Sequence, residues 1–137
     1  MNNLFIKGTS QTPHIDFRID ENYFIISGRS VPEDCDIYYY PVIRFLEIYK
    51  NETENKIIKF EFRLIYYNTT SIRYLNSVMH LIEAISVNNE VSLKWYYDSD
   101  DEYLEEMGEY FKESYDIDFK LIKQILPPKK TRKKLNN

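Results

Sequence analysis

An alternating run followed directly by a helical stripe constrains the fold of this chain more than any other sequence feature. Residues 58–64 alternate apolar and charged side chains (Ile-Lys-Phe-Glu-Phe-Arg-Leu), and residues 72–85 repeat apolar side chains at the i, i+3, i+4 spacing. The first period is that of a strand and the second that of an amphipathic helix. A strand covered by helices on both faces would be apolar almost throughout. We therefore expect a sheet that is wet on one face and covered by helices on the other.

Other periodic segments extend this strand–helix unit in both directions. Five of them have the alternation or apolar content of strands: residues 4–7, 15–19, 23–27, 91–95 and 118–125. A further helix is predicted from the acidic run 98–102 to Phe111, which completes a β-α-β-α-β order from residue 56 onward. Connections of this length imply parallel neighbours with right-handed crossovers. The N-terminal runs are short enough to form an antiparallel hairpin, and we expect it to end at Gly28.

A proline divides the helix predicted between the hairpin and the alternating strand. Ser30 followed by Pro32 and acidic residues is typical of a helix start. A proline inside a helix costs about 3 kcal/mol, and Pro41 lies in the middle of this segment. We therefore expect a short helical turn over 32–36 and a main helix that begins at Pro41. The predicted fold is a single α/β domain, with a mixed sheet (an antiparallel hairpin plus parallel β-α-β-α-β) and about three helices mainly on one face.

Composition is that of a globular protein without covalent cross-links. The sequence has 137 residues, 43% of them apolar, and one cysteine, Cys35. A single cysteine excludes a disulfide framework and a cysteine-rich zinc site. The N-terminus has no secretory pattern, and no apolar run approaches the length of about 18 residues that a membrane span needs. We expect a cytoplasmic protein that makes no contact with a membrane.

Charge divides the chain into an acidic body and a basic tail. Five of the 18 basic residues lie at positions 129–134, so residues 1–128 contain 13 basic and 22 acidic side chains. An acidic body repels the phosphates of nucleic acid, and we expect no nucleic-acid binding. The predicted boundaries are a folded domain over 1–126 and a disordered basic tail over 127–137. The tail could contact an acidic partner or simply fray in solvent.

Residues that could carry catalysis are sparse. His14 and His80 have no triad or metal partner in the sequence, Cys35 has no motif around it, and three scattered glycines exclude the familiar phosphate-binding loops. We expect no catalytic residue, no metal site and no cofactor.

An acidic run partly matches a calcium-binding loop. Asp98, Asp100, Glu102 and Glu109 fall at positions 1, 3, 5 and 12 of that template, but Tyr103 occupies position 6, where the sharp turn needs glycine. Three interpretations stay open at this point. The run is a helix start whose carboxylates favour the positive end of the dipole, a charged docking face, or the metal site of an enzyme that uses residues 98–102.

A cluster of hydroxyls lies between the alternating strand and the helix that follows it. Asn68 precedes Thr69, Thr70 and Ser71, at the edge of the sheet where parallel strands end and partners usually bind. One hydroxyl would suffice to cap the helix, and the unpaired N–H groups of its first turn favour an anion. The cluster is therefore either an ordinary cap or a site of modification, and no catalytic constellation competes with it.

Five sequence blocks follow one another in an order that characterises a known family. They are Thr-Pro-His-Ile at 12–15, Gly-Arg-Ser-Val-Pro-Glu at 28–33, Tyr-Tyr-Pro-Val at 39–42, Tyr-Asn-Thr-Thr-Ser at 67–71, and Trp-Tyr-Tyr at 95–97 with the acidic run 98–106 and Gly-Glu at 108–109 after it. Together, over roughly residues 5–125, they resemble the SiaC family of bacterial regulatory phosphoproteins. The resemblance assigns residues 1–126 to one SiaC-like domain.

The resemblance implies a signalling switch and not an enzyme. Members of the family are small cytoplasmic proteins that a cognate Ser/Thr kinase phosphorylates and a PP2C-type phosphatase dephosphorylates. In the best-known network the unphosphorylated form binds and activates a diguanylate cyclase, so that the output is cyclic di-GMP. The acceptor of the family's Asn-Thr-Ser-Ser block corresponds to Thr69. This chain has Thr70 where the family usually has serine, which makes Thr70 and Ser71 secondary candidates.

We expect the partner to dock over the strand-end edge, with Thr69 at the contact and Thr70 or Ser71 capping the helix beneath it. The other residues expected at this surface come from the ends of three strands: Arg29, Ser30, Tyr67, Asn68, Thr70, Ser71, Tyr97, Asp98, Asp100 and Asp101. Two alternatives stay open besides the metal-dependent enzyme. The layout is also similar to STAS-like anti-sigma-factor antagonists, and a constitutive protein-binding scaffold would need no phosphorylation.

Overall fold

The computed structural model describes residues 1–125, which form six strands and three helices. In chain order these are β1 (Leu4–Ile6), β2 (His14–Arg18), β3 (Tyr23–Ser30), α1 (Cys35–Glu52), β4 (Ile57–Tyr67), α2 (Thr69–Ser86), β5 (Glu90–Asp98), α3 (Glu102–Ser114) and β6 (Asp118–Gln124). None of these helices is long and apolar enough to cross a membrane. The basic tail predicted over 127–137 lies outside the described residues.

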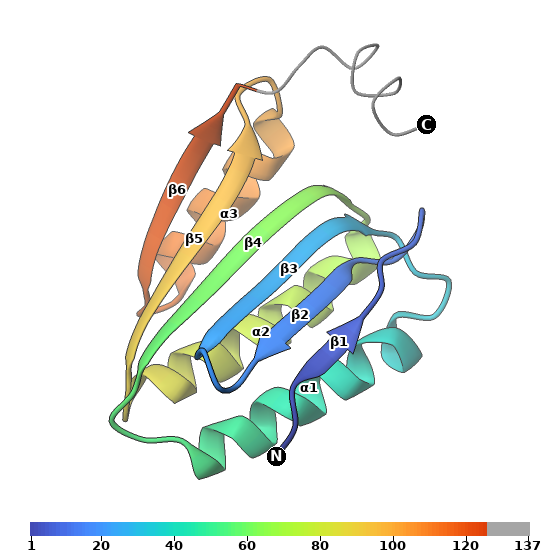
Figure 1. Ribbon diagram of the computed structural model, residues 1–137. Helices are drawn as coiled ribbons and strands as arrows, with labels where there is room; N and C mark the ends of the chain where they lie inside the picture. Colours follow the sequence, from blue (N-terminus) through green and yellow to red (C-terminus); the bar gives the residue numbers. More distant parts are fainter. Residues whose placement is uncertain (126–137) are drawn as a thin grey trace.

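The six strands form a single mixed sheet. Their order is β1-β2-β3-β4-β5-β6, with antiparallel pairing from β1 to β3 and parallel pairing from β3 to β6. Strands that are neighbours in sequence are therefore neighbours in space. All three helices lie on the same face of the sheet (Figure 1). The predicted fold class, an antiparallel hairpin joined to a parallel β-α-β-α-β unit, is confirmed.

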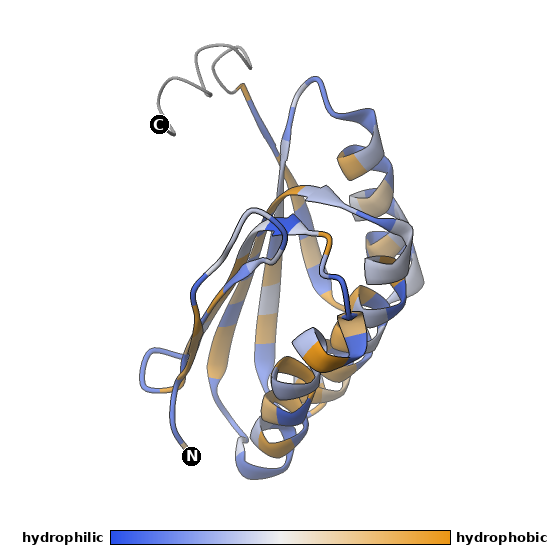
Figure 2. Cartoon of the chain, turned by 90° about the vertical axis from the view of Figure 1, so that its right-hand side faces the viewer, coloured by the Kyte–Doolittle hydropathy of each residue, from blue (hydrophilic) through white to orange (hydrophobic). Residues whose placement is uncertain are grey.

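Strand alternation explains why one face is covered and the other is open. In β4, Ile58, Phe60 and Phe62 are at most 2% exposed, whereas Lys59 between them is exposed. Apolar residues of the sheet and of the helices form one buried core, and apolar positions recur along the strands and helices that enclose it (Figure 2). Burial of this apolar surface is the main favourable term in folding, at about 25 cal/mol per Å².

The third helix packs very closely against the sheet. A Cβ atom added to Gly108 would lie 2.6 Å from Cδ1 of Trp95, which is far inside van der Waals contact. The indole Nε1 of Trp95 donates a hydrogen bond of 2.9 Å to the carbonyl of Leu104 in α3. The fully buried Trp95 thus contacts α3 with its ring and donates its only polar hydrogen to the same helix.

The strand β3 continues beyond the residue at which we expected it to end. Gly28 adopts φ +95°, and the register of β3 against β4 shifts between Gly28 and Arg29. Glycine tolerates positive φ without steric cost, so β3 continues past Gly28, and Ile65 of β4 is the extra residue of a β-bulge beside it. The consequence matters for the site, because the bulge allows Ser30 to pair with Tyr67 at the far end of β4.

The prediction for the first helix is wrong in its start, its cap and its interruption. The helix begins at Cys35, and the side chain of Asp34, not Ser30, accepts its capping hydrogen bond, from the N–H of Ile37. Pro41 lies inside the helix. Burial of Tyr39 before the proline and of Val42 after it, both at 0% exposure, favours one continuous helix over two pieces. Tertiary packing therefore outweighs the local cost of proline.

Candidate functional site

The hydroxyl cluster forms the start of α2, directly after β4. The backbone N–H of Asn68 donates to the carbonyl of Ser30 at 3.0 Å, which ties the end of β4 to the end of β3. The side chain of Asn68 then caps the helix, because its Oδ1 accepts the N–H of Ser71 at 3.0 Å. The helix thus begins at Thr69, inside the hydroxyl cluster that we expected to precede it, and the prediction that Thr70 or Ser71 caps the helix is wrong. Asparagine at this position is a strong cap.

Thr69 and Thr70 are the first two residues of α2, and both are exposed. In the described part of the chain, their hydroxyls make no hydrogen bond. Neither hydroxyl is needed for capping, since Asn68 performs that role. Two threonines at the positive end of the helix dipole are therefore open to an incoming enzyme or partner.

Ser71 points into the interior and belongs to a chain of buried hydrogen bonds. Its Oγ lies 2.7 Å from Oδ1 of Asn68 and 2.8 Å from the carbonyl of Ser30, two acceptors for its single proton. The hydroxyl of Ser30 donates to Ser71 Oγ at 2.8 Å, and the hydroxyl of Tyr39 lies 2.5 Å from Ser30 Oγ. Since Ser30 spends its proton on Ser71, Tyr39 is the donor to Ser30. The hydrogen bonds are thus all donated in one direction, from Tyr39 in α1 to Ser30 and from Ser30 to Ser71 in α2.

Burial fixes the protonation state of Tyr39, the first donor in this series of hydrogen bonds. Tyr39 is fully buried, and burial raises its pKa to about 12, although the hydrogen bond with Ser30 acts in the opposite direction. The phenol therefore keeps its proton at neutral pH. The sequence analysis gave Tyr39 no role beyond its place in the block 39–42, because its contact with Ser30 depends on the course of α1, which we predicted incorrectly.

The predicted site residues fall into two groups, those in the buried hydrogen-bond series and those at the surface. Ser30 and Ser71 are 0% exposed, so they support the site from below and offer no surface to a partner or kinase in this conformation. Arg29 is exposed, and its guanidinium lies 5.0 Å from the ring centroid of Tyr66.

Arg73, which the sequence analysis did not single out, is exposed one helical turn after Thr69. It forms no ion pair within residues 1–125.

Tyr67 connects the hydroxyl cluster to the acidic run. β4 pairs with β5 only as far as Phe62 and Trp95, and the two strands separate beyond that point (Figure 1). The hydroxyl of Tyr67 spans the separation and donates to the carbonyl of Tyr103 at 3.1 Å. Burial, followed by the negative charges of Asp101 and Glu106, raises the pKa of Tyr67. Both predicted clusters thus lie at the same edge of the sheet.

The acidic residues at this edge have local structural partners. Asp101 caps α3 by accepting the N–H of Leu104 at 3.0 Å, and Oδ1 of Asp98 accepts the N–H of Asp100 at 3.3 Å. Tyr97, expected at the surface, is only 7% exposed and donates to Glu105 at 2.9 Å. No group of three His, Cys, Asp or Glu side chains in residues 1–125 is placed to hold a metal ion. The carboxylates instead begin a helix, which their negative charge stabilises.

Comparison with known proteins identifies the family. Residues 6–124 match the SiaC family regulatory phosphoprotein. The chain belongs to this family. A protein of Pseudomonas aeruginosa (strain UCBPP-PA14) whose function is uncharacterized is 31% identical over 120 residues, covering 87% of this chain and 94% of that protein.

Solved structures agree with this assignment. SiaC of Pseudomonas aeruginosa superposes with a TM-score of 0.81 at 29% identity, over 90% of this chain and 100% of that one. The crystal structure of the diguanylate cyclase SiaD in complex with its activator SiaC, from the same organism, matches at a TM-score of 0.80 and 30% identity, over 88% of this chain and 99% of the matched chain. The chain is therefore similar to its relatives over nearly its whole described length.

Proposed function

We propose that this chain is a non-enzymatic signalling switch in the cytoplasm, whose state is set by reversible phosphorylation of Thr69. A family of regulatory phosphoproteins needs an acceptor hydroxyl. The observation that carries the proposal is that Thr69 is exposed at the first position of α2, while its neighbour Ser71 is fully buried. Thr70 is exposed as well and is the secondary acceptor. A Ser/Thr kinase would add the phosphate and a PP2C-type phosphatase would remove it.

A phosphate at Thr69 changes the surface more than the fold. It adds about −1.5 to −2 charges at neutral pH. The first turn of α2 contains no acidic residue and presents unpaired N–H groups, so the helix itself tolerates the new anion. A partner that covers Thr69 would have to bury that charge, and a loss of about 3–4 kcal/mol corresponds to binding that is weaker by about 10²–10³-fold. The switch therefore acts mainly by excluding the partner.

The effector that we propose is a diguanylate cyclase, bound and regulated by the unphosphorylated form. SiaC, which is similar to this chain over most of its length, activates such a cyclase in a solved complex. The docking edge that we propose includes the exposed residues Arg29, Thr70 and Asp100 and the half-buried Tyr67 and Asp98. Tyr67 holds the two halves of this edge together through its bond to Tyr103.

Site-specific phosphorylation tests the proposal. The full chain is incubated with the Ser/Thr kinase encoded beside it, and its peptides are analysed by mass spectrometry. We expect one phosphate on Thr69, loss of that phosphate in Thr69→Ala, and unchanged phosphorylation in the matched control Thr70→Ala. Modification confined to residues outside 68–71 would refute the assignment of the acceptor. Equal binding of the effector by Thr69→Ala and Thr69→Asp would favour a constitutive scaffold.

A further inference from the structure

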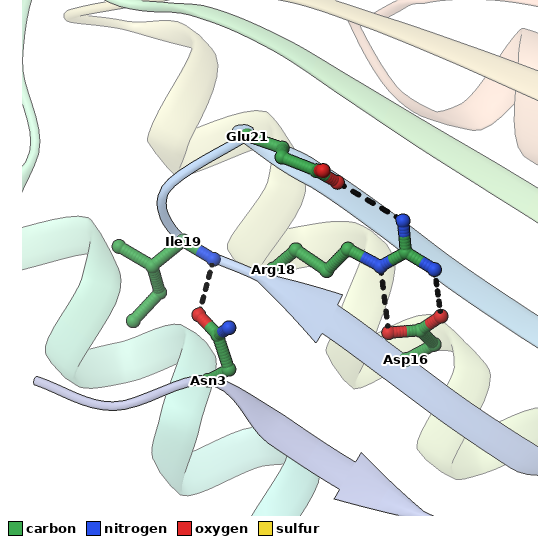
Figure 3. A network of polar contacts seen from close by, with 5 residues as sticks. All are labelled: Asn3, Asp16, Arg18, Ile19 and Glu21. Carbon is green, nitrogen blue, oxygen red and sulfur yellow. Dashed lines mark hydrogen bonds and ion pairs between the residues drawn. The ribbon is translucent and has the colours of Figure 1, made fainter.

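The arginines of the chain differ in whether an anion already compensates them. Residues 1–125 contain Arg18, Arg29, Arg44, Arg63 and Arg73. Arg18 lies between two carboxylates (Figure 3), with its guanidinium 2.8 Å from Asp16 and 3.0 Å from Glu21. Arg63 lies 3.1 Å from Glu61. These two cations are paired where they stand, so neither is available to a new anion.

Arg73 is the uncompensated arginine beside the hydroxyl cluster. Arg29 is held at the end of β3, where its Nε donates to the carbonyl of Ser10 at 3.1 Å. Arg44 lies more than two turns into α1. Within the described residues the guanidinium of Arg73 donates no hydrogen bond and forms no ion pair, and it lies 5.9 Å from the ring centroid of Tyr74. Arg73 is therefore ready to bind an anion at this edge.

Helical spacing places Arg73 beside Thr69. Both are exposed residues of α2, and residues four apart on a helix are neighbours, with about 5–6 Å between their Cβ atoms. Long side chains on a helix point back toward its N-terminus, which directs Arg73 toward the first turn. A phosphate on Thr69 would therefore lie within reach of this guanidinium.

Thr70 has a different neighbour, although it is exposed as well. The residue four positions later is Tyr74, whose hydroxyl donates a hydrogen bond to Asp36 in α1. The ring of Tyr74 stacks on Tyr39 with centroids 5.5 Å apart, so Tyr74 lies on the α1 side of α2. A phosphate on Thr70 would share Arg73 at a spacing of three residues, but it would also approach the carboxylate of Asp36. The electrostatic environment therefore favours a phosphate one residue earlier.

The other charges at this edge make a specific cation necessary. Three carboxylates, Glu33, Asp34 and Asp36, lie at the start of α1. The acidic run 98–102 leads into α3, and the bond from Tyr67 to the carbonyl of Tyr103 brings α3 to the end of β4. A phosphate of about −1.5 to −2 charges would be repelled from both sides. A guanidinium is always charged, and it binds phosphate through two parallel hydrogen bonds.

The geometry points to Arg73 as the residue that holds the phosphate of phosphorylated Thr69 and that makes position 69 more favourable for a phosphate than position 70. This inference rests on the proposed phosphorylation of Thr69, and it adds the group that receives the phosphate. The guanidinium would donate hydrogen bonds to the phosphate oxygens across one turn of α2. Because a nearby cation favours the more highly charged form of an acid, the contact lowers the second pKa of the phosphate.

Phosphorus nuclear magnetic resonance tests this inference without the kinase. Phosphothreonine is incorporated genetically at position 69 of the full chain, and the phosphorus shift is followed with pH. We expect the second pKa of the phosphate to be at least about 0.3 pH units higher in Arg73→Gln than in the natural chain. Arg73→Lys keeps the charge but loses the planar fork, so it should raise that pKa by less.

Arg44→Gln is the matched control, because it removes an exposed arginine from α1. It should leave the phosphate pKa within about 0.1 pH units of the natural value. Thermal unfolding verifies that each variant is folded. Equal titration of the natural chain and Arg73→Gln would overturn the role of Arg73, even where a kinase modifies Thr69. An Arg73 effect on a chain that the kinase does not modify at Thr69 would support this inference and refute only the proposed acceptor.

Phosphothreonine at position 70 tests the preference between the two threonines. We expect the phosphate to have a higher second pKa at position 70 than at position 69, because the carboxylate of Asp36 disfavours the dianion. Asp36→Asn should lower the pKa more at position 70 than at position 69. A lower pKa at position 70 than at position 69 in the natural chain would overturn the preference.

Discussion

The starts of α2 and α3 are built alike, but the start of α3 is acidic and the start of α2 is not. Each helix follows directly after a parallel strand, β4 or β5, and each is capped by a side chain that accepts an N–H three residues later: Asn68 from Ser71 and Asp101 from Leu104, both at 3.0 Å. The first turn of α3 contains Glu102 and Glu105, whereas the first turn of α2 contains no acidic residue.

This difference shows how one structural unit can serve two purposes. In α3 the helix dipole is already satisfied by permanent carboxylates, so a further anion there would be repelled. In α2 the cap is neutral and the first residue, Thr69, bears an exposed hydroxyl. The positive end of α2 is therefore free to accept a negative charge that is added later. Thr69 and Glu102 occupy the same position in their helices, which makes each the natural control for the other.

The largest expected effect concerns how α3 is held in place. Gly108→Leu should lower the free energy of unfolding by about 3 kcal/mol or more, because even a Cβ at this position would overlap the ring of Trp95. Urea unfolding followed by tryptophan fluorescence measures this loss. Glu109→Leu adds the same side chain at the neighbouring exposed position and should change stability by less than about 0.5 kcal/mol. A well-folded, equally stable Gly108→Leu protein would contradict the packing described for α3.

The next effect concerns the buried hydroxyl chain beneath α2, which has no counterpart in α3. Ser71→Ala removes the acceptor of the Ser30 hydroxyl and should cost about 1–3 kcal/mol, because a buried donor is left unsatisfied. Chemical denaturation provides the measurement. Thr70→Ala, one residue earlier and exposed, should stay within about 0.5 kcal/mol of the natural chain. Equal stability of the two variants would mean that the hydroxyl chain contributes nothing.

The smallest effect comes from exchanging the two caps. Asn68→Asp places a carboxylate at the start of α2 and should stabilise the unphosphorylated chain by about 0.3–1 kcal/mol, and Asp101→Asn should destabilise α3 by a similar amount. Thermal unfolding at low ionic strength resolves such differences, and added salt should reduce both of them. Stability changes of the opposite sign, or changes that do not diminish with added salt, would contradict the electrostatic contrast between the two helices.

Much of the fold could be predicted because it follows from local periodicity. The alternation of residues 58–64 correctly placed the charged residues of β4 on the open face, and helical spacing located α2 and α3 to within a few residues. The errors arose where tertiary packing overrides local preference. Pro41 is retained inside α1 because Tyr39 and Val42 are buried on either side of it, and β3 continues through Gly28 to Ser30 with a shift of register against β4.

The candidate site could be predicted only as a set of neighbours in sequence. Adjacent hydroxyls cannot be told apart by their order in the chain, yet Thr69 is exposed and Ser71 is fully buried. That distinction depends on the bulge at Gly28, which brings Ser30 beside Ser71, and on the unbroken course of α1, which brings Tyr39 beside Ser30. Sequence reasoning had no access to either long-range contact.

The measurement that tests the central claim most directly is the affinity of the phosphorylated chain for its effector. A diguanylate cyclase from the same genome is titrated by calorimetry with the unphosphorylated chain, with the chain phosphorylated stoichiometrically on Thr69, and with Glu102→Gln as the control at the matching position of α3. We expect phosphorylation to weaken binding by about 10²–10³-fold and Glu102→Gln to change it by less than about threefold. Equal or tighter binding of the phosphorylated chain would contradict the account.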